Sequence, residues 1–536
     1  MKAPRHSGTH WISVALLATA GAVGCGAQGP TGAAAAASLD GGVEDDSGAT
    51  GGGTQTPPPP ATRDAGAPEA AAPVDASPPP PPAPPAAYVT TDDLSQALTK
   101  TTLTTGDGAK ADAVVTIDAT TTYQSMLGFG ASITDSSSYV MQKYLSASAL
   151  QDLLTKLFDP AQGIGLSFLR QPMGASDFSS VGNFSYDDGN SDPTLANFSI
   201  AQDLKATIPI LKQSLAVNKG LFILGTPWSP PAWMKQNNSM DGSGGASGNP
   251  GLDTNAYGPF GNYFVDFVQA YAAQGVTVNA VTPQNEPLNG SATYPGMGLT
   301  APYETQLIGQ NMGPSFKSAG LSTLIWAYDH NWDQEDYPVT VMSDATAGPF
   351  TEGAAFHCYG GDVSAMTTFH QAYPQKSVYM TECSGGGWQD DPFANTIDLE
   401  IGSTANWARA IALWNMALDE NAGPQNNGCN DCRGVVTVNS TSGDVTYNVD
   451  YYALGHFSKF VSPGAVRISS TTQSNSFSQV AFKNTDGSVA VIGHNTGSST
   501  MTVQVGSGET AMSASVPANA AITFAWTPGS EATGDE

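Results

Sequence analysis

Residues 278–287, VNAVTPQNEP, join a short apolar run to an Asn-Glu-Pro triplet that places Glu286 directly after the run. A short apolar run that stops at turn-forming residues is typical of a strand buried on both faces of a sheet. Further along the chain, residues 377–384, SVYMTECS, repeat the pattern and place Glu382 after a second apolar run. The two segments therefore predict two buried strands that each end in a glutamate.

Six other segments show the same change from apolar to polar residues, and stretches with the apolar spacing of helices lie between several of them. The six are GFGASITDS (128–136), LSFLRQPMG (166–174), LFILGTPWS (221–229), TLIWAYDH (323–330), AAFHCYG (354–360) and IALWN (411–415). The expected helices include SASALQDLLTKLF (146–158), LKATIPILKQSLAV (204–217), FGNYFVDFVQAYAAQG (260–275) and YETQLIGQNMGPSFKSAG (303–320). Eight strand–helix units in series predict an α/β fold, a (β/α)8 TIM barrel.

A different pattern flanks the predicted barrel. After residue 463 the chain consists of short alternating runs such as SVAVIGHN and AITFAW, separated by Gly, Asn, Ser and Asp. This pattern predicts an all-β sandwich, which the runs YVTT (88–91) and AVVTIDAT (113–120) complete from the other side of the barrel. The predicted domains are N-terminal sandwich strands at 87–122, the catalytic barrel at 123–460 and C-terminal sandwich strands at 461–530.

Charge limits the partners of the protein. The 536 residues include 19 Lys and Arg against 47 Asp and Glu, which gives a formal net charge of −28. A surface this acidic repels phosphate backbones and anionic lipid, so we expect no nucleic-acid partner. The sequence also predicts no transmembrane span, because no apolar run is long enough. It makes no prediction of the oligomeric state.

The first residues have the pattern of an export signal. A basic start is followed by an apolar run, WISVALLATAGAV (11–23), and by small residues, so residues 1–25 are predicted to direct export. Ala-Val-Gly-Cys ending at Cys25 resembles a bacterial lipoprotein box, and lipidation of Cys25 would anchor the protein; simple cleavage, giving a free secreted protein, is the alternative. Residues 26–86 are rich in Ala, Gly and Pro and are predicted to be a disordered tether.

The strand ends predict where the chemistry occurs, because a (β/α)8 barrel forms its active site at the C-terminal ends of its strands. Two carboxyl groups on opposite sides of a bond are what hydrolysis of a glycoside requires. The side chains at the predicted strand ends suit sugars: Asp135, Arg170, Trp228, Asn285, Glu286, His357, Tyr359, Glu382 and Trp414. The sequence therefore predicts a carbohydrate-active site with Glu286 and Glu382 as its catalytic pair.

The two glutamates receive different roles in this hypothesis. Glu286 acts as general acid and then as base, so its pKa is expected to be raised. Glu382 stays ionised and attacks the anomeric carbon, and Asn285 hydrogen-bonds the sugar 2-hydroxyl. Retention of configuration requires the two carboxyl groups to lie roughly 5–5.5 Å apart. Alone, an Asn-Glu-Pro triplet could be an ordinary loop entry, and the second strand-end glutamate is what favours catalysis.

Eight pieces of the chain, found in one order between about residues 123 and 467, resemble glycoside hydrolase family 30 and its glucosylceramidase-like branch. They are GFGASITDS, RQPMGASDFS, TPWSPPAWMK, VTPQNEP, HCY, TEC, LWNMALDENAGP and YYALGHFSKFVSPGAVRI. The resemblance implies a TIM barrel with a β-sandwich built from both of its ends, a retaining mechanism and no metal or organic cofactor. The chain departs from the glucosylceramidase pattern in residues 383–388 and 424–432, loops that the resemblance places around the aglycone.

The resemblance also implies what surrounds the nucleophile. Arg170 is expected beneath Glu382, where it would keep the carboxylate charged. His357 and Tyr359 are expected to face Glu382 from the sixth strand. Arg170 and His357 could instead be satisfied polar groups of the core.

Four further residues are expected, from the resemblance, to form the sugar pocket. Asp135 is expected to bind sugar hydroxyls, although it could serve as a helix N-cap as well. Trp228 is expected to wall the pocket and Trp414 to stack on the sugar, and both could also be packing residues of the barrel top. Tyr294 is expected on a loop at the acid/base side.

Four cysteines follow Cys25. Cys429 and Cys432 lie in the Gly- and Asn-rich segment NGCNDCRG, where no further ligands suit zinc and no helix begins, so a disulfide is the prediction. Cys358 and Cys383 follow neighbouring strands and could pair or remain free.

The sequence thus predicts an exported retaining β-glycosidase, secreted or held at the bacterial surface, that hydrolyses β-glucosidic bonds of a carbohydrate or glycolipid in the manner of glucosylceramidase. An endo-β-1,6-glucanase or a xylanase of the same family is the alternative within this class. A surface lipoprotein that binds carbohydrate without catalysis is the alternative of another class.

Overall fold

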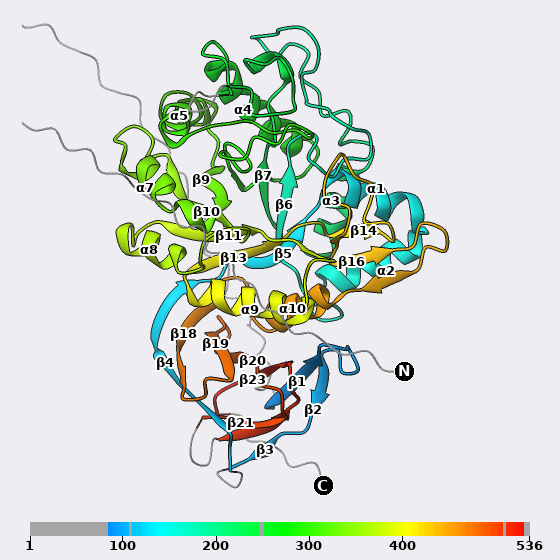
Figure 1. Ribbon diagram of the computed structural model, residues 1–536, viewed down its shortest axis with the longest axis vertical. Helices are drawn as coiled ribbons and strands as arrows, with labels where there is room; N and C mark the ends of the chain where they lie inside the picture. Colours follow the sequence, from blue (N-terminus) through cyan, green and yellow to red (C-terminus); the bar gives the residue numbers. More distant parts are fainter. Residues whose placement is uncertain (1–83, 107–109, 246–250, 507–510, 530–536) are drawn as a thin grey trace, which may run out of the picture. The chain divides into compact units, whose positions relative to one another are not determined.

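A computed structural model describes residues 84–106, 110–245, 251–506 and 511–529 (Figure 1). The predictions for the export signal at 1–25, for Cys25 and for the tether up to residue 83 lie outside these residues. Among the helices that the structure describes, none is long and apolar enough to cross a membrane.

Eight parallel strands close into a barrel in the order β10-β11-β13-β5-β6-β7-β8-β9. All eight strands lie where the sequence predicts them, and the TIM barrel is confirmed. Their bounds are β5 Gly128–Ser132, β6 Phe168–Pro172, β7 Phe222–Thr226, β8 Ala280–Val281, β9 Leu324–Asn331, β10 Thr351–His357, β11 Ser377–Glu382 and β13 Ala408–Leu413.

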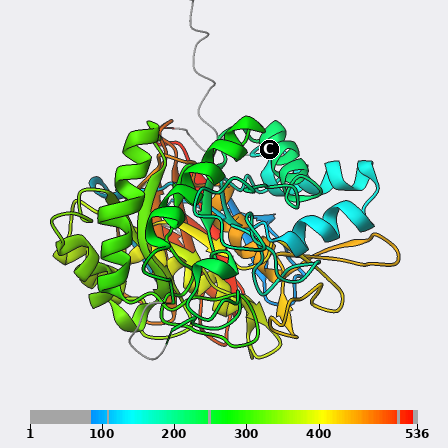
Figure 2. The ribbon, with the colours of Figure 1, turned by 90° about the horizontal axis from the view of Figure 1, so that it is seen from above.

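Helices follow the strands of the barrel. Figure 2 shows the molecule from the end at which α4 and α5 lie in Figure 1. The helices of the described part are α1 Asp135–Tyr144, α2 Ala147–Phe158, α3 Thr207–Val217, α4 Tyr257–Ala273, α5 Ala301–Leu307, α6 Gly313–Ala319, α7 Asp336–Ser343, α8 Ala365–Ala372, α9 Pro392–Ala405 and α10 Val449–Ser458. Short helical turns are η1 Ala232–Met234, η2 Ile308–Met312 and η3 Trp332–Gln334. The single helix predicted at 303–320 consists of α5, the π-helical turn η2 and α6, because Pro314 has no N–H to continue the α-helical ladder.

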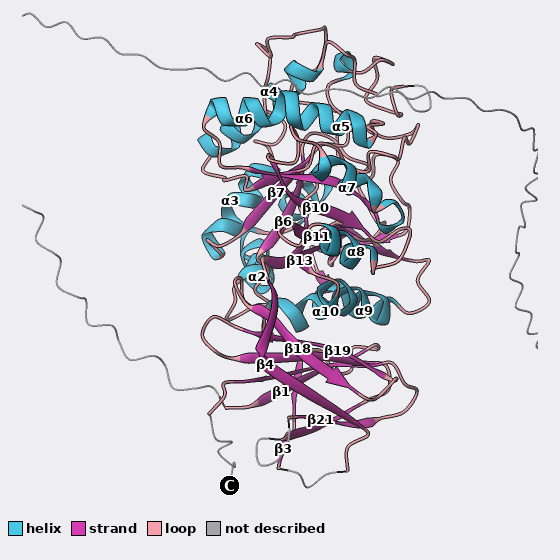
Figure 3. Cartoon of the chain, turned by 90° about the vertical axis from the view of Figure 1, so that its left-hand side faces the viewer, coloured by secondary structure: helices cyan, strands magenta, loops and turns pink. Residues whose placement is uncertain are grey.

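The sandwich contains strands from both sides of the barrel, as the sequence predicts (Figure 3). Strand β23 pairs with β1, and the long strand β4 pairs with both β18 and β21 before the chain enters the barrel at β5. The ten strands are β1 Ala86–Thr91, β2 Thr99–Thr101, β3 Thr104–Thr105, β4 Ala113–Ser125, β18 Val466–Thr472, β19 Phe477–Lys483, β20 Val489–Asn495, β21 Met501–Val505, β22 Met512–Val516 and β23 Ala520–Trp526. The strands β1, β19, β20 and β23 of the sandwich pack on the helices α9 and α10 of the barrel.

Five short strands that the sequence analysis did not predict shape the loops after β11 and β13. They are β12 Gly385–Gly386, β14 Ala417–Asp419, β15 Cys432–Arg433, β16 Val436–Val438 and β17 Val445–Tyr447. The pair β12–β15 ties the loop after β11 to the loop after β13.

Large side chains such as Phe168, Trp326 and Tyr379 fill the inside of the barrel, and the Trp326 and Tyr379 rings stack with their centroids 3.5 Å apart. The barrel interior is therefore a packed core, as is usual for this fold. An active site of the barrel is therefore expected above this core, where the strands end.

Candidate active site

A cavity of about 690 Å³ opens at the C-terminal ends of the barrel strands. Seven predicted site residues line it: Trp228, Asn285, Glu286, Tyr294, Tyr359, Glu382 and Trp414. Its other lining residues are Asp177, Leu288, Asn289, His330, Asn331, Ser384, Trp388, Asn427, Gly428, Cys429 and Cys432. A larger cavity of about 1020 Å³, lined in part by Phe460, Asp486 and Trp526, offers a single carboxylate and lacks the pair that the chemistry needs.

The backbone at the end of β8 presents Glu286 to this cavity. Glu286 has a positive φ of 46°, a conformation that non-glycine residues rarely adopt. Its N–H donates to the carbonyl of Asp329 at 3.0 Å, and its own carbonyl accepts from the N–H of Asn289 at 2.8 Å. The turn is thus fixed from both sides. The Glu286 carboxylate accepts from Asn289 Nδ2 at 2.7 Å and lies 3.2 Å from His357 Nδ1.

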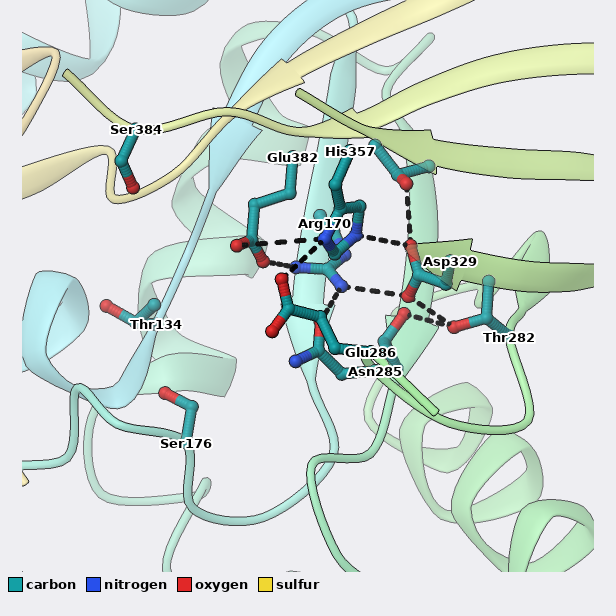
Figure 4. Close-up of polar contacts among 12 residues, drawn as sticks. Thr134, Arg170, Ser176, Thr282, Asn285, Glu286, Asp329, His357, Glu382 and Ser384 are labelled. Atoms are coloured by element: carbon teal, nitrogen blue, oxygen red, sulfur yellow. Dashed lines mark hydrogen bonds and ion pairs between the residues drawn. The ribbon is translucent and has the colours of Figure 1, made fainter. Parts of the chain in front are cut away.

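Arg170 of β6 lies beneath Glu382, as the resemblance implied. It is fully buried, donates through Nη1 to Glu382, and donates through Nη2 to Asn285 Oδ1 at 2.6 Å and Asp329 Oδ2 at 2.8 Å. The hydroxyl of Tyr359 donates to the other oxygen of Glu382 at 2.9 Å. Figure 4 shows Arg170 between Glu382 and Asp329, with Glu286 beside them. Both carboxylate oxygens of Glu382 are therefore held by donors.

The separation of the two glutamates fits one of the two stereochemical courses of glycoside hydrolysis. One carboxylate oxygen of Glu286, one of Glu382 and a ring nitrogen of His357 all lie within 4.8 Å of one another. Retaining enzymes hold their carboxyl groups about 5–5.5 Å apart, whereas inverting enzymes need about 6.5–9.5 Å for a water. The spacing agrees with the shorter of the two distances and favours direct attack by a carboxylate.

Asp329, which the sequence analysis did not single out, is the buried centre of the network. Its Oδ1 accepts from Thr381 at 2.6 Å and lies 3.0 Å from His357 Nε2, and its Oδ2 accepts from Thr282 at 2.7 Å as well as from Arg170. Its φ is +65°, at a place where the pairing of β9 with β10 shifts register. The available signal was its position at the end of the predicted strand 323–330.

The surroundings of His357 favour its protonated, cationic form. Both of its ring nitrogens face carboxylates, Glu286 on one side and Asp329 on the other, so both must carry a proton to donate. Burial alone would lower the pKa of His357, but the charges of Glu382 and Asp329 and these hydrogen bonds raise its pKa to about 9. No ring nitrogen of His357 is left to bind a metal, and the prediction that the protein uses no cofactor stays a prediction.

The expected order of the two glutamate pKa values is wrong. Burial acts to raise the pKa of Glu286, but the hydrogen bond and the charge of His357 outweigh it and lower that pKa to about 2. Burial raises the pKa of Glu382, with the Glu286 charge adding to it, against the opposing charges of His357 and Arg170. Two cations thus face three carboxyl groups, Asp329 included, and one proton shared by the coupled glutamates balances the charge.

Asp135 does not line the cavity, and Asp177 does. The Asp135 carboxylate accepts from the N–H of Ser180 at 2.7 Å, from the Ser180 hydroxyl at 2.6 Å and from Gln202 at 3.3 Å. It is not the helix N-cap either, because Thr134 accepts the N–H of Ser137 and caps α1. Asp177 lies half-buried on the cavity wall, and its buried Oδ1 has no hydrogen-bond partner among the described residues.

Aromatic rings form one wall of the cavity. Trp228 and Trp414 stack on each other with centroids 4.8 Å apart, and the Arg170 guanidinium lies 4.8 Å from the Trp228 centroid. Phe178 packs edge-on against Trp414. Tyr294 packs against the same aromatic cluster, and its hydroxyl accepts from Asn289 at 3.4 Å. Flat apolar surface next to hydrogen-bonding groups suits a sugar ring.

Two disulfides lie beside the cavity. Cys358 pairs with Cys383, which joins the residues that follow β10 and β11, and Cys429 pairs with Cys432 in the loop after β13. The pairing of Cys429 with Cys432 is the one that the sequence analysis expected, and the pairing of Cys358 with Cys383 was left open there.

A (β/α)8 barrel with two facing glutamates over a buried arginine and histidine, beside an aromatic wall, defines a glycoside hydrolase. The match to family models is specific: the "Glycosyl hydrolase family 30 TIM-barrel domain" matches residues 126–461, and the corresponding "beta sandwich domain" matches residues 464–524. The chain therefore belongs to glycosyl hydrolase family 30 and is a β-glycosidase with a carbohydrate substrate.

Named relatives fall into two groups. An "Endo-1,6-beta-D-glucanase" of Neurospora crassa is 40% identical over 68% of this chain and 76% of that protein. The "Lysosomal acid glucosylceramidase" of Mus musculus is 28% identical over 71% of this chain and 76% of that protein. A solved structure titled as an endo-β-1,6-glucanase has 31% identity and a TM-score of 0.76, and covers 83% of this chain and 100% of that one.

Proposed function

We propose that the protein is an exported, retaining endo-β-1,6-glucanase in which Glu286 is the acid/base and Glu382 the nucleophile. The observation that carries the mechanism is the approach of a Glu286 oxygen to a Glu382 oxygen within 4.8 Å across a cavity suited to a sugar. The 40% identity to a relative named as an endo-1,6-glucanase supports the linkage.

The reaction has two steps of opposite sense. In the first, a Glu382 oxygen bonds to the anomeric carbon, the glycosidic C–O bond breaks, and the proton of Glu286 passes to the leaving oxygen. In the second, Glu286 takes a proton from water, the water oxygen bonds to the anomeric carbon, and the ester bond to Glu382 breaks. Configuration is inverted twice and so retained.

The shared proton must lie on Glu286 when the sugar is bound. The donors on Glu382 favour this state, since Arg170 and Tyr359 hold one oxygen each and stabilise the carboxylate. Glu286 is also the more exposed of the two side chains, at 13% against 7%, which suits a group that exchanges protons with incoming water. After the first step Glu382 is a neutral ester, and His357 stabilises the charge that Glu286 then carries.

The groups around the pair orient the sugar. Asn285 accepts from Arg170 through Oδ1, and its Nδ2 has no partner among the described residues, so it is free to bind a hydroxyl. Asp177 offers its unpartnered Oδ1 from the wall and takes the sugar-binding role first expected of Asp135. Trp228 and Trp414, which stack on each other, offer a flat apolar surface to the sugar ring.

The glucosylceramidase-like prediction has weaker support than its alternative within the family, because relatives named as glucosylceramidases are 28–31% identical, whereas those named as endo-1,6-glucanases are 37–40% identical. The prediction of a non-catalytic binder has the least support, because a binding protein does not require a proton-sharing pair of glutamates. Export, with or without a lipid on Cys25, stays part of the proposal.

The two glutamates are tested by substitution. Glu286→Gln should lower kcat on a glucan by roughly 10²- to 10⁴-fold but spare formation of the glycosyl ester from a dinitrophenyl glucoside, whose leaving group needs no proton. Glu382→Ala should lose hydrolysis and, with azide and an activated β-glucoside, form an α-configured glucosyl azide. Equal losses on both substrates for Glu286→Gln, or a β-configured azide product, would reverse or remove these roles.

Products of polysaccharide digestion test the linkage. A linear β-1,6-glucan should yield a ladder of oligosaccharides early in the reaction, because an endo enzyme cuts within chains. Release of glucose alone, or cleavage of glucosylceramide in preference to the glucan, would favour the glucosylceramidase-like reading instead.

A further inference from the structure

A second cavity of about 810 Å³ adjoins the catalytic cavity. Three residues line both cavities: Tyr359, Ser384 and Trp388. Beyond them the second cavity runs between the loops that follow β10 and β11 and the helix α9, with Asp362, Asn395 and Asp398 along it. The space open to a ligand therefore extends past the sugar that sits between Glu286 and Glu382.

Trp388 stands at the junction with its side chain in solvent. It is 52% exposed, whereas Trp228 and Trp414 are almost completely buried. A large exposed aromatic side chain loses the stabilisation that burial would give it, so its position over a cavity points to a ligand. Tyr359, 45% exposed, stands beside it and is held by Ser384 at 3.0 Å as well as by Glu382.

The loop fixes the Trp388 ring before any ligand arrives. The ring packs on Gly386, where a Cβ would lie 2.1 Å from it, so only glycine fits beneath. Gly386 pairs with Cys432 in the β12–β15 ladder, and the N–H of Gly387 donates to the Asp431 carbonyl at 3.0 Å. A ring that is already ordered binds a ligand without a further loss of side-chain entropy.

A second set of bonds holds the end of the same loop. Gln389 Oε1 accepts from the N–H of Gly386 at 3.2 Å and from Arg433 Nη2 at 3.0 Å. Arg433 in turn pairs with the buried Asp450 of α10. The loop that carries Trp388 is thus anchored to the body of the barrel.

The charge of the second cavity selects among chains. Its lining includes four aspartates and, among the described residues, no Lys, Arg or His; the aspartates are Asp362, Asp390, Asp391 and Asp398. Carboxylates and amides accept and donate hydrogen bonds to hydroxyl groups, but they repel carboxylated sugars. The lining suits a neutral, hydroxyl-rich chain.

We propose that Trp388 is the stacking platform for a second glucosyl unit of a neutral glucan, and that the second cavity binds the chain beyond it. This inference rests on the proposed glucanase activity and adds a specificity-determining residue to it. It gives the loop at 383–388, which departs from the glucosylceramidase pattern, a role in choosing a polymer over a single glucoside.

The test compares two substrates that differ only in what lies outside the catalytic sugar. A linear β-1,6-glucotriose reaches the platform, whereas β-glucosyl fluoride does not. For Trp388→Ala, the ratio of kcat/KM on the triose to kcat/KM on the fluoride should fall roughly tenfold, the factor that about 1.4 kcal/mol of binding represents. Trp388→Phe, which keeps a flat ring, should recover most of the ratio.

Controls separate the possible failures. Leu204→Ala removes another exposed apolar side chain, 44% exposed and outside both cavities, and should leave the ratio unchanged. If Trp388→Ala loses fluoride hydrolysis through misfolding, Trp388→Leu, which keeps apolar bulk over Gly386, takes its place. A ratio equal to that of the unsubstituted protein would overturn the platform. If the unsubstituted protein cleaves neither the triose nor the fluoride, the proposed function itself is overturned.

Discussion

Replacing His357 with glutamine should move the whole pH profile of activity toward higher pH. His357 is buried, and as a cation it lies 3.2 Å from a Glu286 oxygen and 4.0 Å from a Glu382 oxygen. Glutamine preserves a hydrogen-bonding side chain but removes the positive charge. Without that charge each carboxyl group holds its proton more firmly, so the pKa values of the pair rise.

The size of the shift follows from the distances. Two unit charges 4.0 Å apart attract with about 4 kcal/mol at an effective dielectric constant of about 20. One pKa unit corresponds to about 1.4 kcal/mol, so about 3 units is the upper end of the shift for Glu382, and the limit for Glu286, whose oxygen lies nearer at 3.2 Å, is about 4 units. Opposite charges this close commonly change a carboxyl pKa by about 1–3 units, and we expect both limbs of the profile to move by that amount.

The assay is kcat/KM for an aryl β-glucoside as a function of pH, because this quantity reports the ionisations of the free enzyme. His330→Gln is the matched control. His330 also lines the cavity, but burial, with the His357 charge acting the same way, lowers the pKa of His330 to about 4, so it is neutral near pH 7. An unmoved profile for His357→Gln, or an equal shift for both variants, would refute a cationic His357.

Two further predictions concern other carboxyl groups. Asp177→Ala should lower kcat/KM on β-glucosides by about 10- to 100-fold, as expected for the loss of a hydrogen bond of about 1.5–3 kcal/mol. Asp135→Ala should chiefly lower the Tm, because it removes the hydrogen bonds that Ser180 donates. An equal or larger activity loss for Asp135→Ala would return the sugar-binding role to that residue. Burial raises the pKa of Asp203 to about 7, against the hydrogen bonds from Tyr186 and Tyr271, so the folded protein keeps a proton that the unfolded chain releases near pH 4. Stability measured by urea unfolding should therefore fall between about pH 4 and 7, and Asp203→Asn should remove on the order of 4 kcal/mol of that fall; an unchanged slope would contradict the raised pKa.

The strands and most helices could be predicted because their signal is local. An apolar run of five to eight residues that stops at polar or turn-forming residues is sufficient to place β9 at 323–330, where the structure has Leu324–Asn331. The short strands β12 and β15 had no such signal. They are two residues long and lie in Gly- and Asn-rich loops. They form only because they pair with each other, and their partners are distant in the sequence.

The two facing glutamates could be predicted for the same reason, since Glu382 ends β11, Glu286 lies in the loop after β8, and the ends of the barrel strands must converge. Asp329 also stands at a strand end, but its importance arises from bonds to Arg170, His357 and two threonines that are distant in the sequence. The pKa values were beyond reach of the sequence as well. A raised pKa was expected for Glu286 because of its burial and the second carboxylate. The charge of His357 and its hydrogen bond lower that pKa instead.

Charge balance explains why such a site needs Asp329 at all. Arg170 and His357 alone would offset both glutamates, and then neither glutamate would have reason to hold a proton near neutral pH. Asp329 is a third buried carboxylate and is bonded to both cations, so it neutralises one of the two positive charges. Only one positive charge then remains to offset the two glutamates. A proton supplies the missing charge, and a proton on one of two facing carboxyl groups is what a retaining glycosidase requires at the start of its cycle.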